Sequence, residues 1–186
     1  GSLDYLIVKA DKKGDHVFTI MSDDGSRFGD IASTVDNGFV LTGMNYEGNN
    51  QAFIKKFSSS ENIEWERYFW TDSIQNIYSI KQTEDLGYII AGRISTDSNG
   101  DMDVLIMKFD AQGNQVWLKS FDNGGYESAQ VVHQISDGGY ILMCRGESFN
   151  WDNHECLLIK TDSDGNEIWR KTFSENDFGM CYCGKF

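Results

Sequence analysis

Four oxygen-bearing side chains stand at alternate positions of one polar segment and could bind a metal ion. They are Asp97, Asn99, Asp101 and Asp103. Oxygen ligands at every second position are typical of calcium loops. The segment departs from the EF-hand pattern, because its glycine falls fourth and Lys108 occupies the twelfth position in place of a glutamate. Calcium is one hypothesis for this segment, and a solvated turn between two strands is the other.

Polar side chains on two strand-like segments form a second candidate site. Lys81 and His133 stand 52 residues apart, and each is followed by a glutamine, Gln82 and Gln134. Polar residues on the inner strands of an all-β ring often line a water-filled channel. We predict a small-ligand site that includes Lys81, His133 and Gln134, with a purely structural role as the alternative.

An aromatic pair in a polar loop is a third candidate. Phe149 and Trp151 lie in the segment 146–154, among Asn, Asp and Ser residues. Such an aromatic side chain can stack on a sugar ring or fill a pocket of a partner protein. The alternative is that Trp151 folds back over its own sheet, since single exposed apolar residues are common.

The four cysteines allow two kinds of cross-link. Cys144 ends one predicted strand and Cys156 opens the next, so a hairpin would bring them close enough for a disulfide, which implies an oxidising compartment. Two buried thiols are the alternative. A zinc site formed by Cys156 with His154, Cys181 and Cys183 is a further option, although the gaps between these residues are shorter than usual.

Catalytic motifs are otherwise missing from the sequence. None of the three histidines stands in a nucleophile motif, and there is no Gly-x-Ser-x-Gly or phosphate-binding glycine loop. The 29 acidic residues create many carboxylate pairs by accident, so a glycoside hydrolase pair stays open as an alternative.

The elements that must position these residues are set by an internal repeat. A lysine recurs at Lys9, Lys56, Lys108 and Lys160, with spacings of 47, 52 and 52 residues. Nine residues after each lysine stands a large aromatic residue, at Phe18, Trp65, Trp117 and Trp169. Recurrent aromatics of this kind are expected to pack between neighbouring repeats.

A second module alternates with the first and opens with an Asp-x-Gly step. It begins at Asp36, Asp85 and Asp137, and an aromatic residue and an apolar run follow each step. We interpret the step as hairpin-turn chemistry, in which the glycine supplies a positive φ. The later Asp-x-x-Gly-Asn steps that precede Trp117 and Trp169 are interpreted in the same way. Each repeat then contains four short strands, and no amphipathic helical pattern is sustained.

Four strands per repeat of about fifty residues predict an all-β propeller built from four-stranded antiparallel blades. The predicted repeat units span about 27–70, 74–121 and 126–173. Residues 3–21 together with 174–186 would supply a fourth, hybrid blade, so that 3–186 form one domain of about four blades. Residues 1–2 are interpreted as a cloning scar. An arc of a larger propeller, or two chains joined in one ring as a homodimer, are the alternatives.

Three segments carry a family resemblance: Gly-Gly-Tyr-Ile-Leu at 138–142, Leu-Ile-Lys-Thr-Asp-Ser-Asp-Gly-Asn-Glu-Ile-Trp at 158–169, and Lys-Thr-Phe at 171–173. They resemble the repeats of bacterial and archaeal WD40-like and PQQ-like β-propeller proteins. The resemblance implies a fold, and it implies little about function because such propellers serve many tasks. The Asp-x-x-Gly-Asn-x-x-Trp turn is similar to the sialidase Asp-box but differs in its Asp-to-Gly spacing. Nothing indicates a bound quinone, and no cofactor other than calcium is expected.

The charge balance narrows the class of partner. The net charge of −13 argues against nucleic acid and anionic membranes, which both require basic patches. No apolar run is long enough to span a bilayer. The chain contains no proline, which agrees with a fold made almost entirely of paired strands.

We therefore expect a non-enzymatic binding or scaffold protein that presents loops to a protein or glycan partner. We expect it on the cell surface or in the cell envelope, with the cytoplasm as the other possibility. A propeller glycosidase or lyase that uses carboxylates is one alternative. A structural fragment of a longer surface protein is the other.

Overall fold

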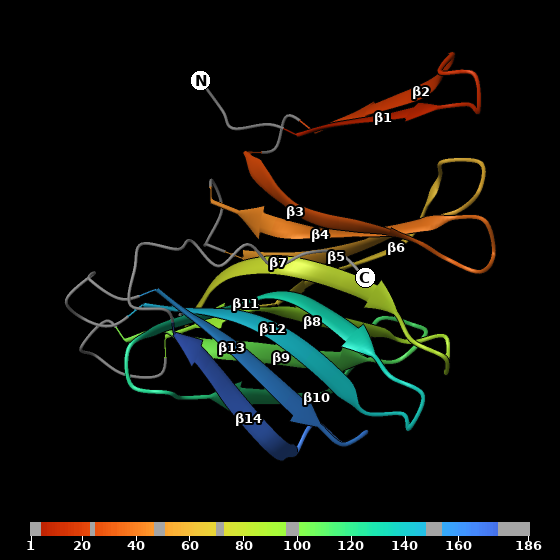
Figure 1. Cartoon of the computed structure of the whole chain (residues 1–186). Coiled ribbons are helices and arrows are strands. Elements are labelled where there is room, and N and C mark those ends of the chain that lie inside the picture. The colour runs from red at the N-terminus through yellow and green to blue at the C-terminus, as the bar shows by residue number, and fades with distance from the viewer. Residues whose placement is uncertain are drawn as a thin grey trace.

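The structure, a computed structural model, is all-β (Figure 1). It describes residues 5–22, 25–46, 51–69, 73–95, 101–147 and 154–174. Within these ranges the chain forms 14 strands and no helix, so the described residues contain no helix that could cross a membrane. The strands form one two-stranded and three four-stranded antiparallel sheets.

We name the sheets A to D in chain order. Sheet A contains β1 (Leu6–Ala10) and β2 (His16–Met21); sheet B contains β3 (Ser26–Ser33), β4 (Phe39–Asn45), β5 (Gln51–Phe57) and β6 (Ile63–Phe69); sheet C contains β7 (Ile74–Gln82), β8 (Tyr88–Ile94), β9 (Asp103–Phe109) and β10 (Gln115–Phe121); sheet D contains β11 (Tyr126–Gln134), β12 (Tyr140–Glu147), β13 (His154–Thr161) and β14 (Glu167–Ser174). In each sheet the spatial order follows the chain order. The bounds of sheets B, C and D differ from the sequence repeats by at most one residue at either end.

The sheets face one another and bury an apolar layer at each junction. Sheets A and B share one cluster, sheets B and C a second, and sheets C and D a third. Sheet C contributes to two of them through alternating side chains: Ile90 belongs to the B–C cluster, and Ile89 belongs to the C–D cluster. The first strands of neighbouring sheets also touch, β3 with β7 and β7 with β11 (Figure 1).

The repeated lysine forms an ion pair with the aspartate of the Asp-x-Gly step in all three four-stranded sheets. Lys56 pairs with Asp36, Lys108 with Asp85 and Lys160 with Asp137, at 2.7–2.8 Å. The side chain of Lys108 is 7% exposed, and its ammonium also donates to the Phe109 carbonyl. The lysine therefore ties the third strand of each sheet to the turn between the first and second strands.

The repeated aromatic residues pack between sheets, as predicted for Phe18, Trp65 and Trp117. Trp65 of sheet B meets Tyr88 of sheet C edge to face, and Trp117 of sheet C meets Tyr140 of sheet D in the same way. Phe18 of sheet A stacks on Phe39 of sheet B. The two-stranded sheet A thus uses the same contact as the complete sheets.

The glycine of the Asp-x-Gly step does not supply the positive φ, so that prediction was wrong. The positive φ belongs to the middle residue of the step, at Asn37, Leu86 and Gly138. The glycine is needed because of close packing: a Cβ on Gly87 would lie 2.3 Å from the Phe109 carbonyl oxygen and 2.4 Å from the Lys108 ammonium. The Asp-x-x-Gly steps do follow the expected chemistry, with φ of +77° at Gly113 and at Gly165.

Leu86 is expected to be a strained position, because a leucine occupies the left-handed region at φ 65°. We predict that Leu86→Asn raises the free energy of unfolding by about 1 kcal/mol, because asparagine tolerates this conformation. Urea denaturation measures the change. Leu86→Ala is the matched control, since it removes the exposed side chain but keeps the strain. Equal stability of the two variants would contradict the prediction.

The ion-paired aspartates predict an acid-sensitive fold. Hydrogen bonds from Lys56 and Thr34 hold the pKa of Asp36 far below its ordinary value. Burial raises the pKa of Asp85, but hydrogen bonds from Lys108 and Thr83 outweigh it and leave the pKa lowered. Because these pKa values are lower in the folded chain, the unfolded chain takes up more protons as the pH falls below about 4.

We therefore expect the urea midpoint to fall as the pH is lowered from about 4 towards 2. Asp85→Asn should lower the midpoint at neutral pH and make its decline in acid shallower. A midpoint of the wild-type chain that does not change over this range would contradict the role of the ion pairs.

Candidate functional site

Strand register brings three acidic residues together at one end of the junction between sheets C and D. Asp103 begins β9, and Asp122 follows the last residue of β10. Val104 pairs with Phe121, so the residues just beyond this pair are cross-strand neighbours. Glu127 is the second residue of β11 and donates its N–H to the Met102 carbonyl at 2.6 Å.

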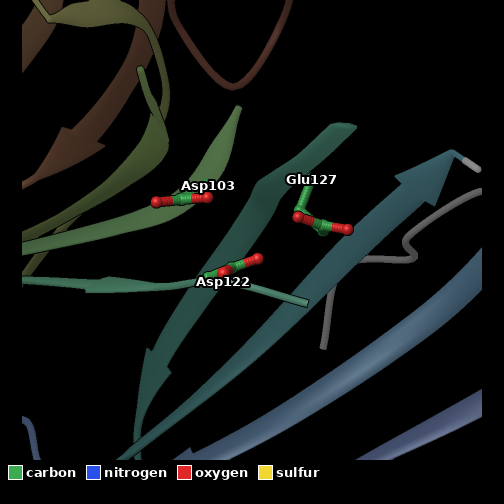
Figure 2. A group of neighbouring side chains, drawn as sticks. All are labelled: Asp103, Asp122 and Glu127. Atoms are coloured by element: carbon green, nitrogen blue, oxygen red, sulfur yellow. The ribbon is translucent and has the colours of Figure 1, made fainter. Parts of the chain in front are cut away.

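We call Asp103, Asp122 and Glu127 the acidic trio. One carboxylate oxygen from each lies within 4.8 Å of the other two, and Figure 2 shows the three carboxyl groups gathered in one place. Asp103 is 4% and Glu127 3% exposed, whereas Asp122 is exposed. The trio therefore has a buried side and an open side.

The electrostatics of the trio centre on Glu127. Burial raises its pKa to about 7, a hydrogen bond from the Asn123 N–H opposes this shift, and the charges of Asp101, Asp122 and Asp103 add to it. Its Oε2 atom has no hydrogen-bond partner among the residues that the structure describes. A buried carboxylate oxygen without a donor is costly, so this side chain calls for an explanation.

Arg170 is a basic side chain that lies beside Asp122. Arg170 donates from Nη1 to the Asp122 carbonyl oxygen at 2.5 Å. Its Nε and Nη2 atoms donate to the Glu167 carboxylate at 2.9 and 2.5 Å. The Glu167 carboxylate therefore neutralises much of the positive charge of Arg170.

A polar cavity of about 370 Å³ adjoins Glu127, and we call it the arginine cavity. Its lining includes Tyr78, Arg93, Tyr126, Glu127, Gln130 and Arg145. The two arginines come from neighbouring sheets, Arg93 from β8 and Arg145 from β12. A space of this size can hold a small ligand.

The charge of the arginine cavity is set by its two guanidinium groups. The Nε atom of Arg93 is buried and has no hydrogen-bond partner among the described residues. Burial raises the pKa of Tyr78, while the positive charges of Arg93 and Arg145 oppose this shift. Among the residues that line the cavity, the two guanidinium groups outnumber the one carboxyl group, that of Glu127.

The predicted pair Lys81 and His133 lines one smaller cavity, of about 130 Å³, together with Asp30 and Tyr78. The Lys81 ammonium is 2.9 Å from an oxygen of Asp30. Burial lowers the pKa of His133, and the charge of Lys81 lowers it further. The two residues are thus brought together, but Lys81 is already ion-paired and the space is small.

Gln134, the third residue of that prediction, lies elsewhere and connects two sheets. Its side-chain oxygen accepts from the Glu84 N–H at 2.8 Å, and its amide donates to the Gly138 carbonyl. Gln82 makes the matching bond to the Val35 N–H at 2.9 Å. The glutamine at this position thus links sheet D to a turn of sheet C, and sheet C to a turn of sheet B.

The predicted calcium site at Asp97, Asn99, Asp101 and Asp103 stays a prediction, because only part of it lies within the described residues. Asp97 and Asn99 lie outside them. Asp101 and Asp103 are described, and the carboxylates near Asp103 come from the segment 122–127, which the prediction did not include. The aromatic pair Phe149 and Trp151 also lies outside the described residues.

The predicted disulfide between Cys144 and Cys156 was wrong. Cys144 is a buried thiol, and Cys156 is disulfide-bonded to another cysteine. In the register of β12 and β13, Cys144 stands opposite Leu157, and Cys156 stands opposite Arg145. The two cysteines therefore point to opposite faces of sheet D. A cysteine in a disulfide cannot act as a zinc ligand, which removes Cys156 from the proposed zinc set.

Asp122, Glu127 and the two arginines were missed by the sequence analysis, which named only Asp103 of the trio, although the repeat contains a signal for these positions. At the matching positions of the preceding repeat, 52 residues earlier, the trio is replaced by Gln51, Trp70 and Gln75. Arg93 and Arg145 share one repeat position, where the first repeat has Met44. Charged residues that depart from the repeat are candidates for function, because the fold does not require them.

Comparison with known proteins does not assign the chain to a family. No family model matches the sequence, and no curated protein matches it. One solved structure, a protein of unknown function from Bacteroides caccae, is similar over 91% of this chain and 75% of its own, with 12% identity and a TM-score of 0.38.

Proposed function

We propose that this chain is a non-enzymatic, propeller-like binding domain whose ligand is an acidic sugar. The observation that carries the proposal is the arginine cavity, in which Arg93 and Arg145 of adjacent sheets line the same small space. A protein that used this surface only as a scaffold would not need two partly buried guanidinium groups there.

The propeller arrangement is part of the proposal. Three four-stranded sheets that follow one another in the chain, with their first strands adjacent, support three complete blades. Sheet A has the strand count of a partial blade, and its Phe18 makes the same contact as Trp65 and Trp117. We propose about four blades in total, and a homodimer remains the alternative way to close the ring.

The chemistry of the cavity favours a carboxylate, or another planar anion, attached to a sugar. A guanidinium group donates two parallel hydrogen bonds to a carboxylate, and this geometry makes arginine the preferred residue for such recognition. Tyr78 and Tyr126 offer aromatic surface for a sugar ring, and Gln130 can bind hydroxyl groups. We therefore name uronic acids as the ligand class.

The disulfide bond of Cys156 bears on the cellular compartment of the protein. Cys156 is disulfide-bonded, and disulfides persist mainly in oxidising environments. This supports a location on the cell surface or in the envelope, where acidic polysaccharides and other extracellular partners are encountered.

Isothermal titration calorimetry with matched oligosaccharides tests the proposal. The full chain would be titrated with oligogalacturonides and with neutral galacto-oligosaccharides of equal length. We expect saturable binding of the acidic series only, weakened by added salt. Equal affinity for both series, or no binding of either, would refute an acidic-sugar ligand.

A carboxylate-dependent glycosidase or lyase is the second candidate, and Glu127 favours it. A buried acid with a pKa of about 7 beside another carboxyl group is a common arrangement in glycosidases. Incubation of oligogalacturonides with the protein, followed by mass spectrometry, separates the two functions. Shortened products that disappear with Glu127→Gln would favour the enzyme, and intact oligosaccharides would favour the binding domain.

A further inference from the structure

We infer that Asp103, Asp122 and Glu127 form a calcium site at the junction of sheets C and D. This site shares Glu127 with the lining of the arginine cavity, but the inference does not depend on the proposed sugar ligand. Asp103 is one of the ligands expected from the sequence, whereas Asp122 lies between β10 and β11 and Glu127 lies at the start of β11.

The first support is geometric. Three carboxylate oxygens within 4.8 Å of one another can contact one cation at the short distances that calcium needs. They are held by elements on both sides of the junction, since Asp103 belongs to sheet C and Glu127 to sheet D. A bound ion would therefore bridge the two sheets.

The second support is the unpartnered oxygen of Glu127. The side chain is 97% buried, its carboxyl group lies beside those of Asp103 and Asp122 (Figure 2), and its Oε2 atom has no donor among the described residues. A cation beside this oxygen would supply the missing interaction and reduce the cost of burying the carboxylate.

The third support is the distribution of charged side chains around the trio. Asp101 adds a fourth carboxylate whose charge acts on Glu127. Arg170 is itself bound to Glu167 and donates to the main-chain oxygen of Asp122. Acidic groups thus surround Glu127 on the side of the trio, while Arg93 and Arg145 lie on the side of the arginine cavity.

The chemical type of the three ligands indicates which metal ion they would bind. All three candidate ligands are carboxylates, with no imidazole or thiolate among them. Hard oxygen donors suit calcium, magnesium and manganese, and the flexible coordination of calcium best fits ligands from two sheets. The repeat supports a dedicated site, because the matching positions Gln51, Trp70 and Gln75 carry no charge.

Terbium luminescence tests the site directly, because terbium replaces calcium and is excited by nearby aromatic rings such as Tyr126. The full chain, freed of metals with a chelator, would be titrated with terbium and then with calcium. We expect emission to saturate at about one equivalent and to be lost when calcium displaces terbium. No sensitised emission, or emission that calcium does not compete away, would overturn the proposal.

Variants of the trio identify the ligands. Asp103→Asn and Glu127→Gln should each weaken calcium binding at least about tenfold, while Asp164→Asn, an exposed turn residue on sheet D, should leave it unchanged. Glu127→Gln keeps the side-chain shape, so its fold can be checked by its thermal midpoint without metal. Binding that is unaffected by both trio variants, or weakened equally by Asp164→Asn, would place the ion elsewhere.

Calcium should also raise the thermal midpoint of the wild-type chain, because a ligand of the folded state stabilises it by mass action. This shift should be absent in Glu127→Gln. This result is independent of the sugar titration. A chain that binds calcium but no oligogalacturonide would support the metal site and refute the proposed function. A chain that binds oligogalacturonide but no calcium would support the proposed function and refute the metal site.

Discussion

Replacing Arg145 with alanine is expected to lower the affinity for an oligogalacturonide by about 30-fold. A hydrogen-bonded pair between an arginine and a carboxylate contributes about 2 kcal/mol when it is shielded from water. Arg93→Ala should have a similar effect, since both guanidinium groups line the same cavity. Calorimetric titration of each variant measures the loss.

Two control variants distinguish specific hydrogen bonding by Arg145 from an effect of the protein's net charge on affinity. Arg145→Lys keeps the charge but loses the two-pronged geometry, so we expect its affinity to lie between those of the wild type and Arg145→Ala. Arg67→Ala removes a half-buried arginine of β6 that donates to the Gln112 carbonyl, outside the cavity. A loss of affinity in Arg67→Ala as large as in Arg145→Ala would show that the effect comes from net charge alone.

Replacing Gly87 with alanine is expected to destabilise the fold by about 3 kcal/mol or more. The new Cβ would stand 2.3 Å from the Phe109 carbonyl oxygen and 2.4 Å from the Lys108 ammonium. Relief of this clash requires either separation of β8 from β9 or breakage of the Lys108–Asp85 ion pair, and both are costly. For a chain of this size the thermal midpoint should fall by roughly 10 °C.

Gly14→Ala serves as the matched control for Gly87→Ala. Gly14 has φ +87° and no atom within 4 Å of an added Cβ, so its substitution introduces backbone strain without a clash. We expect it to cost only about 1 kcal/mol. If Gly87→Ala were no more destabilising than Gly14→Ala, the close packing inferred at the Asp-x-Gly turn would be incorrect.

The repeat made the strands predictable. Lys56, Lys108 and Lys160 are ion-paired to the turn aspartates, and Trp65 and Trp117 pack on the next sheet. Because these contacts stabilise every four-stranded sheet, the same residue types recur, and their spacing reveals the strand bounds. The reason for the Asp-x-Gly glycine could not be predicted in this way, because it depends on how closely β8 approaches the carbonyl oxygen of Phe109.

The candidate site was largely hidden from the sequence because strand register assembles it. Asp103 and Asp122 are 19 positions apart, and only the pairing of Val104 with Phe121 makes them neighbours. A shift of register by one residue moves a side chain to the opposite face, and this is also why Cys144 and Cys156 could not form the expected disulfide.

The central claim is that Arg93 and Arg145 together bind an acidic sugar, and arginine side-chain NMR tests it most directly. The Nε–Hε signals of the ¹⁵N-labelled full chain would be assigned with Arg93→Lys and Arg145→Lys and followed during titration with digalacturonate. The account predicts that these two signals shift together and saturate, while that of Arg67 stays in place. Saturable binding that leaves both signals unchanged would contradict it.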